Sequence, residues 1–261
     1  MQVTFEQCQR ELLDRGGAKA RSVYSSWTQR RGYQDVVTFV TGFRHEYLFA
    51  ITPHDIQKVI NDSEHALGDV KSKEQLAEIE NYTCPFALQH IFHDYLEKNQ
   101  KIPTWQDFWL WMTEDARSLW LTPLAPTLHK LFRQYGCWDR IKRAVRWRLG
   151  KFYYSAIREV DLIAHLHSND VPVKYHLLAD VLFRTDFWLD DVIISLYFKN
   201  RKYRDGQTGR KPKTFDLFED AEPPFELREY GVDRQGFGEF WLVKDESKRE
   251  LVAELSKLLV R

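Results

Sequence analysis

The chain has 261 residues, enough for one large domain or two small ones. Its 38 basic and 38 acidic side chains cancel, which excludes a uniformly positive surface for a polyanion. Three widely spaced cysteines exclude a disulfide framework, and no apolar run approaches the ~18 residues that span a bilayer. We therefore expect a cytoplasmic protein without membrane contact.

Composition and hydrophobic spacing predict three segments. Residues 1–82 form an N-terminal α/β region, residues 83–150 a helical, helix-turn-helix-like region, and residues 151–261 a mixed-sheet α/β domain. The predicted fold class is α+β, with a helical N-terminal half and a C-terminal mixed β-sheet flanked by helices.

The N-terminal region begins with helical spacing over residues 5–27. Residues 33–41 are β-branched and aromatic, which predicts a short strand. Thr52 followed by Pro53 is typical of a helix start, with Thr52 as the cap. The polar, acidic residues 61–81 are expected to be a solvated helix or a linker.

Residues 83–150 predict four helices. The first covers 86–97, the second opens at Pro103-Thr104, the third covers 122–135 and ends at Gly136, and the fourth begins near Trp138. The fourth helix has a concentrated positive face, which can neutralise phosphates. Its cations are Arg140, Lys142, Arg143, Arg146 and Arg148. The alternative is a basic helix that pairs with the acidic tail of this chain or with a partner protein.

Two runs in this region carry a family resemblance. KIPTWQDF and, after a gap, TPLAPTLHKLFRQYGCWDRIKRAV resemble the small helical repeat found beside homing and HNH-type endonucleases. The resemblance covers roughly residues 90–150 and implies a helix-turn-helix-like module that touches DNA. Tyr-Gly-Cys-Trp at 135–138 stands where the repeat has Phe-Gly-Ser-Trp.

The next segment predicts a helix over 151–167 and then a β-hairpin. Residues 181–189 and 192–198 flank Asp190-Asp191, a two-residue turn. If Leu189 pairs with Val192, Asp186 lies opposite Ser195. One face of the hairpin is then polar and the other apolar. The polar face carries Asp186, Ser195, Tyr197 and Lys199, and the apolar face Val192, Ile194, Leu196 and Phe198.

This arrangement resembles the core of PD-(D/E)xK restriction-endonuclease-like folds. The resemblance implies that Asp186, Lys199 and Glu159 are catalytic and that Mg²⁺ or Mn²⁺ assists attack on phosphorus. Tyr197 stands where the family has its second acid. A metal site would therefore join Asp186 to another acid, Asp180, Asp190 or Asp191, and we take Asp180. The alternatives are an inactive version of that fold and an unrelated α/β domain.

A basic stretch follows the hairpin. NRKYRDGQTGRKP interleaves cations with Tyr and Gly, which suits contact with a phosphate backbone. The expected nucleic-acid contacts are Arg201, Lys202, Tyr203, Arg204, Arg210 and Lys211. A surface loop without a ligand is the alternative.

The C-terminal residues predict a second hairpin, 225–230 with 238–243, and a final amphipathic helix over 247–260. Residues 216–246 lean acidic and could bind a protein partner.

The sequence thus predicts a nucleic-acid-binding protein of nuclease-like architecture, with DNA favoured over RNA, in a mobile-element or defence context. The alternative is a non-enzymatic adaptor or inhibitor that binds proteins through its segregated basic and acidic faces.

Overall fold

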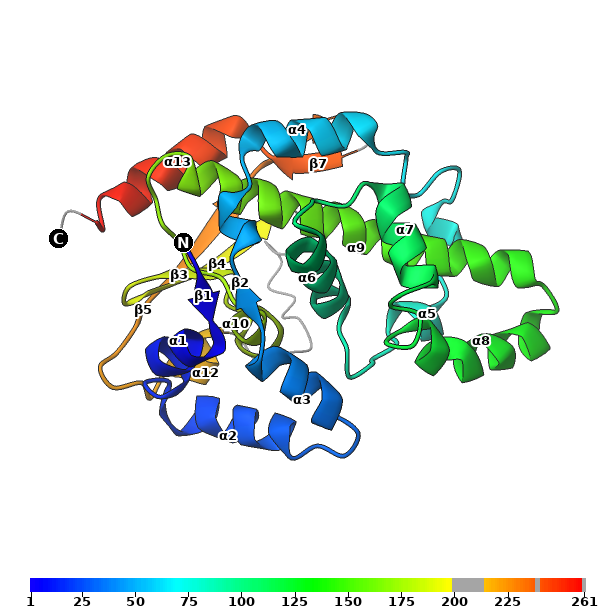
Figure 1. Ribbon diagram of the computed structural model, residues 1–261, viewed down its shortest axis with the longest axis horizontal. Helices are drawn as coiled ribbons and strands as arrows, with labels where there is room; N and C mark the ends of the chain where they lie inside the picture. Colours follow the sequence, from blue (N-terminus) through cyan, green and yellow to red (C-terminus); the bar gives the residue numbers. More distant parts are fainter. Residues whose placement is uncertain (199–213, 238–239, 260–261) are drawn as a thin grey trace. The chain divides into compact units, whose positions relative to one another are not determined.

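A computed structural model describes residues 1–198, 214–237 and 240–259. The chain has the predicted α+β class, with helices through the N-terminal half and a mixed sheet with flanking helices in the C-terminal half (Figure 1). Lys199, Arg201, Lys202, Tyr203, Arg204, Arg210 and Lys211 lie outside the described residues.

Two compact units divide the chain. Unit 1 comprises Met1–Ala50, Leu162–Phe237 and Trp241–Arg261, and unit 2 comprises Ile51–Asp161 with Gly238–Phe240. The boundaries fall after residues 50 and 161, whereas composition suggested boundaries after residues 82 and 150.

Unit 1 begins with short elements and ends with the sheet. Its elements are β1 (Val3–Thr4), α1 (Phe5–Cys8), α2 (Gly17–Thr28), α3 (Gln34–Thr41), β2 (Arg44–His45), α10 (Leu177–Phe183), β3 (Phe187–Leu189), β4 (Val192–Phe198), α12 (Thr214–Phe218), β5 (Glu226–Val232), β6 (Arg234–Phe237), β7 (Phe240–Val243) and α13 (Asp245–Ser256).

Unit 2 is helical. Its elements are α4 (Pro53–Asp62), α5 (Ala77–Glu80), α6 (Leu88–Asn99), α7 (Trp105–Thr113), α8 (Leu121–Tyr135) and most of the long helix α9 (Trp138–His167). The four helices expected between residues 83 and 150 are confirmed, and the expected helix over 151–167 is the continuation of α9.

The main sheet has the order β3-β4-β5. The predicted register is confirmed, because Leu189 pairs with Val192 and β3 runs antiparallel to β4. β3 is shorter than the expected strand over 181–189, since helix α10 covers residues 177–183 and so takes the first part of that range. The His176 side chain accepts a hydrogen bond from Leu178 N, and Arg184 ends the helix in the left-handed region at φ 57°. This local capping favours the helix over the predicted strand.

Two further strand predictions were wrong. Residues 34–41 form α3, whose Val36 and Val40 are buried one turn apart, so packing overrides their strand propensity. β5 pairs in parallel with β4, while β7 pairs with β6. Parallel pairing needs a long crossover connection, which no local turn pattern in the sequence indicates.

The sheet separates two layers of unit 1. One face packs in a core with the end of α9 and with α13; its buried side chains are Leu162, Leu166, Val171, Val173, Phe187, Leu189, Val192, Ile194, Val232, Val243, Leu251 and Leu255. On the opposite face, Trp188 is buried and its indole N–H donates to Glu11 Oε2 at 2.8 Å. Lys174 Nζ donates to the same oxygen at 2.9 Å. Both faces of β3 are therefore covered, which fixes this strand of the hairpin.

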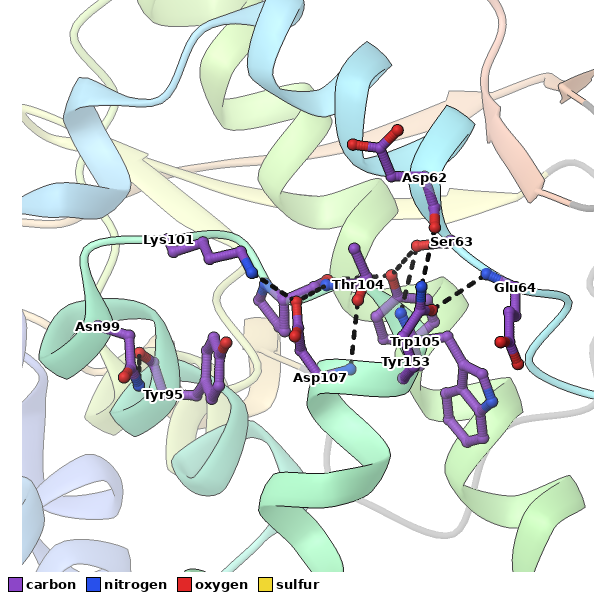
Figure 2. A network of polar contacts seen from close by, with 12 residues as sticks. Asp62, Ser63, Glu64, Tyr95, Asn99, Lys101, Thr104, Trp105, Asp107 and Tyr153 are labelled. Atoms are coloured by element: carbon purple, nitrogen blue, oxygen red, sulfur yellow. Dashed lines mark hydrogen bonds and ion pairs between the residues drawn. The ribbon is translucent and has the colours of Figure 1, made fainter.

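Capping fixes the helices of unit 2. Thr104 Oγ1 accepts from Asp107 N, and the Asp107 carboxylate accepts from Thr104 N and Lys101 Nζ (Figure 2). The Ser63 and Tyr153 hydroxyls lie 2.8 Å apart, and Ser63 Oγ also accepts from Trp105 N. Burial raises the pKa of Tyr153. These polar groups are mutually satisfied, so we assign this network a structural role.

Candidate functional site

The basic face of α9 is partly neutralised within unit 2. Arg143 Nε donates to Glu74 Oε1 at 2.5 Å, and its Nη1 donates to Asp69 Oδ2 at 2.9 Å. These hydrogen bonds lower the pKa of both carboxyl groups. Arg143 therefore already has two anionic partners in its own unit.

Two more cations of α9 have internal partners. Arg146 donates to the backbone oxygens of Ala66 and His65, at 2.9 and 3.1 Å. Arg148 Nη1 lies 3.6 Å from Glu80 Oε1. The partner segment, residues 65–80, is itself anchored by buried apolar side chains: Ala66, Val70, Leu76 and Ile79. Three of the five predicted cations thus hold this segment to α9.

The other two predicted cations, Arg140 and Lys142, lie near the start of α9, and Lys130 and Arg133 lie near the end of α8. Lys130, Arg133, Arg140 and Lys142 are exposed, and we call these four residues the basic corner. Arg140 lies over the Tyr135 ring, 4.1 Å from its centroid. Among the described residues, Lys130, Arg133 and Lys142 form no ion pair.

The joint between the two helices is built locally. Gly136 ends α8 in the left-handed region at φ 64°, and α9 begins two residues later. Across the joint, Trp138 stacks on Phe132 with centroids 4.7 Å apart and planes 13° apart. The stacked rings and the glycine hold the two helix ends together. The cations of the basic corner therefore lie on helix ends that are fixed relative to each other.

Asp186 immediately precedes β3. Its backbone N–H donates to Ile194 O at 3.1 Å, and its Oδ2 accepts from Leu196 N at 2.6 Å. The carboxylate is therefore fixed against β4 by a short charge-assisted hydrogen bond. The pairing predicted between Asp186 and Ser195 continues the observed register.

A hydroxyl bridge next to Asp186 joins β4 to α12. Ser195 Oγ and Thr214 Oγ1 lie 3.2 Å apart, and both hydroxyls donate to Arg184 O, at 3.3 and 2.9 Å. This bridge attaches the start of α12 to the strand face that carries Ser195.

The other candidate acids have separate surroundings. Asp180, on α10 in unit 1, accepts a hydrogen bond from the Tyr175 hydroxyl at 3.0 Å. Glu159, on α9 in unit 2, lies 3.9 Å from His93 Nε2. His93 is a contact that sequence reasoning missed, although its place beside Asp94 on a helix with many buried residues was a signal.

A divalent metal needs several oxygen ligands at one point. Within residues 1–198, 214–237 and 240–259, no group of three His, Cys, Asp or Glu side chains could hold a metal ion. The described residues therefore do not complete the Mg²⁺ or Mn²⁺ site expected at Asp186 and Asp180, and we derive no catalytic step through a metal.

The basic corner was only partly foreseen. Lys130 and Arg133 precede the predicted fourth helix and were not singled out, although they follow helical spacing on the exposed side of α8.

No helix in the described part of the chain has the length and hydropathy of a membrane span. Comparison with protein-family models, curated proteins and solved structures gave no significant match.

Proposed function

We propose that the chain binds nucleic acid through the basic corner, with DNA favoured over RNA. The observation that supports this proposal is the exposure of four cations on two helices joined at Gly136, three of them without an ion pair among the described residues. Cations of this kind displace condensed counterions from phosphates, which favours binding.

The preference for DNA follows from groove dimensions. The major groove of B-form DNA admits an α-helix, whereas the major groove of A-form RNA is too narrow for side chains to read. The corner ends one helix and begins another, so either can approach a wide groove while the cations contact the backbone. The contacts proposed here are with phosphates and carry no base sequence.

A matched pair of variants tests the binding surface. The corner variant Lys130→Gln, Arg133→Gln, Lys142→Gln removes three positive charges. The control Lys58→Gln, Lys73→Gln, Arg117→Gln removes three exposed charges of the same types from the same unit. Fluorescence anisotropy with a labelled duplex should show at least a roughly 10-fold loss of affinity for the corner variant. Equal losses in the two variants would overturn the proposal.

We further propose that unit 1 has nuclease-like architecture, with Asp186 as its acidic centre. Support comes from the Asp186 carboxylate, which accepts a hydrogen bond from Leu196 N on β4. The cation-rich sequence 199–213 follows β4 in the chain. Catalysis would require hydrolysis of a phosphodiester bond, in which water adds to phosphorus and an alkoxide leaves.

Plasmid cleavage tests the catalytic part by itself. Supercoiled DNA is incubated with the protein in Mg²⁺ or Mn²⁺, alongside Asp186→Asn and the control Asp35→Asn, an exposed acid of α3 in the same unit. The proposal predicts nicking by the wild type and the control, and none by Asp186→Asn. Intact plasmid in every lane, with binding retained, would instead favour a non-enzymatic protein.

A further inference from the structure

Trp138 is an exposed aromatic ring that begins α9, two residues before Arg140 of the basic corner. The residue is 37% exposed, although tryptophan is among the side chains that gain most from burial. Among the described residues, its ring contacts come from α8. It stacks on Phe132 and lies edge-on to His129, with the centroids of Trp138 and His129 5.5 Å apart. More than a third of this tryptophan therefore remains accessible to a ligand.

Cations of the basic corner accompany this ring on both helices. On α9, Lys142 follows Trp138 by four residues, so their side chains are neighbours on one face of the helix. On α8, Arg133 follows His129 by four residues and is its neighbour in the same way. Lys142 and Arg133 are exposed and form no ion pair among the described residues. The accessible ring thus has an available cation beside it on each helix.

The turn before the ring leaves room for a ligand, while the ring itself is held in place. Gly136 and Cys137 are exposed, and a Cβ built on Gly136 would meet no atom within 4 Å. The planes of Trp138 and Phe132 are 13° apart, so the indole rests on a ring of the neighbouring helix. Because the indole is already ordered, a ligand that contacts it loses little side-chain entropy of the protein.

An ordered aromatic ring beside cations is a combination that binds unpaired bases. A base presents a flat face to the ring, and its phosphate can be contacted by a neighbouring Lys or Arg. Inside an intact duplex each base is stacked on its neighbours and offers the ring no free face. An unpaired base that adjoins a duplex offers a face to the ring and duplex phosphates to the other cations of the basic corner.

We propose that Trp138 stacks on an unpaired base, so that the basic corner prefers DNA in which a single strand adjoins a duplex. This inference rests on the proposed nucleic-acid binding and deepens it by naming the class of substrate. The cations contact phosphates, which every strand has, whereas the ring adds a contact that requires a base without a stacking neighbour.

Abasic DNA separates the base contact from the phosphate contacts. One duplex carries a single-stranded thymidine tail, and a second carries a tail of equal length made of abasic sites, which keeps the phosphates and removes the bases. Fluorescence anisotropy should show that the wild type binds the thymidine tail about 5- to 150-fold more tightly, the ratio expected for one stacked base. A blunt duplex measures the contribution of the basic corner without a tail.

Substitutions at Trp138 assign that ratio to the ring. Trp138→Leu keeps an apolar side chain against Phe132 and removes the ring, so affinity for the thymidine tail should fall to that for the abasic tail. Affinity for the blunt duplex should fall less. Trp138→Phe should retain part of the preference because it keeps a ring. The control Leu110→Ala removes another exposed apolar side chain of unit 2 and should bind all three DNAs as the wild type does.

Four results would overturn the inference. Equal affinity of the wild type for the two tails, with the blunt duplex bound, would do so without any variant and leave the proposed function standing. An unchanged preference in Trp138→Leu would show that the base is held elsewhere. An equal loss of blunt-duplex and thymidine-tail affinity in Trp138→Leu would limit Trp138 to joining the helices. If the wild type binds none of the three DNAs, the proposed function and the inference fail together.

Discussion

Arg143 and its two carboxylate partners illustrate how a cation predicted to face DNA can serve the fold instead. Its guanidinium reaches Glu74 and Asp69, and the segment that carries them buries Val70, Leu76 and Ile79. Displacing that segment would expose three apolar side chains, each worth about 1.5–3 kcal/mol when buried. Nucleic acid is therefore not expected to compete for this arginine.

The Arg143 contacts predict a pH dependence. The pKa of Glu74 lies below its ordinary value of 4.5, chiefly because Arg143 donates hydrogen bonds to its carboxylate. A lowered folded-state pKa stabilises the protein above pH 4.5, and that contribution is lost as the pH falls through the folded-state value. Arg143→Gln should remove part of this dependence. Urea unfolding at neutral pH and at about pH 3.5 measures it.

The control for that experiment is Arg133→Gln, which removes an exposed cation without an ion pair among the described residues. It should leave the acid-induced loss of stability as in the wild type. An identical pH profile for Arg143→Gln and the wild type would contradict a stabilising role for the Glu74 contact. Duplex affinity should show the opposite order, because Arg133→Gln should weaken binding more than Arg143→Gln does.

At the scale of elements, the joint of α8 and α9 depends on one backbone conformation. Gly136 has φ 64°, and a Cβ built there would meet no atom within 4 Å. Alanine would therefore fit sterically against its surroundings but strain its own backbone. We predict that Gly136→Ala destabilises the protein by about 1 kcal/mol, and that Gly136→Asn costs less because Asn tolerates this region. Urea unfolding measures both; equal stability of all three proteins would contradict it.

The elements that sequence predicted well are those defined by local signals. Thr52 caps its helix as expected, the second helix opens at Thr104, and Gly136 ends α8. The register of β3 with β4 followed from a two-residue turn. α10 was missed because buried leucines and a phenylalanine suit a strand or a helix, and the choice depends on caps at His176 and Arg184.

At the scale of the molecule, sequence patterns could not predict pairings between distant segments. The parallel pairing of β5 with β4 joins residues more than thirty positions apart, as in Val192 with Glu226. The neutralisation of Arg143 by Asp69 and Glu74 is of the same kind, with separations of 74 and 69 residues. The basic face of a helix could be seen in the sequence, but which of its cations were already paired could not.

The pairing of cations with internal acids limits what the whole protein can bind. Its net charge is zero, so binding to a polyanion depends on the few cations that internal acids leave unpaired. The three candidate catalytic residues have different surroundings. Asp186 is fixed against β4, and Glu159 lies near His93 in the other unit. Lys199 is outside the described residues. The function proposed for the protein therefore depends first on nucleic-acid binding.

The salt dependence of duplex affinity tests that claim most directly. The logarithm of the association constant is plotted against the logarithm of salt concentration for the wild type, the corner variant and its charge-matched control. Each phosphate contact contributes about 0.9 to the slope, so loss of three corner cations should reduce its magnitude by up to about 2.7. The control should keep the wild-type slope. A wild-type protein that fails to bind duplex DNA, or whose affinity does not fall with salt, would contradict the account.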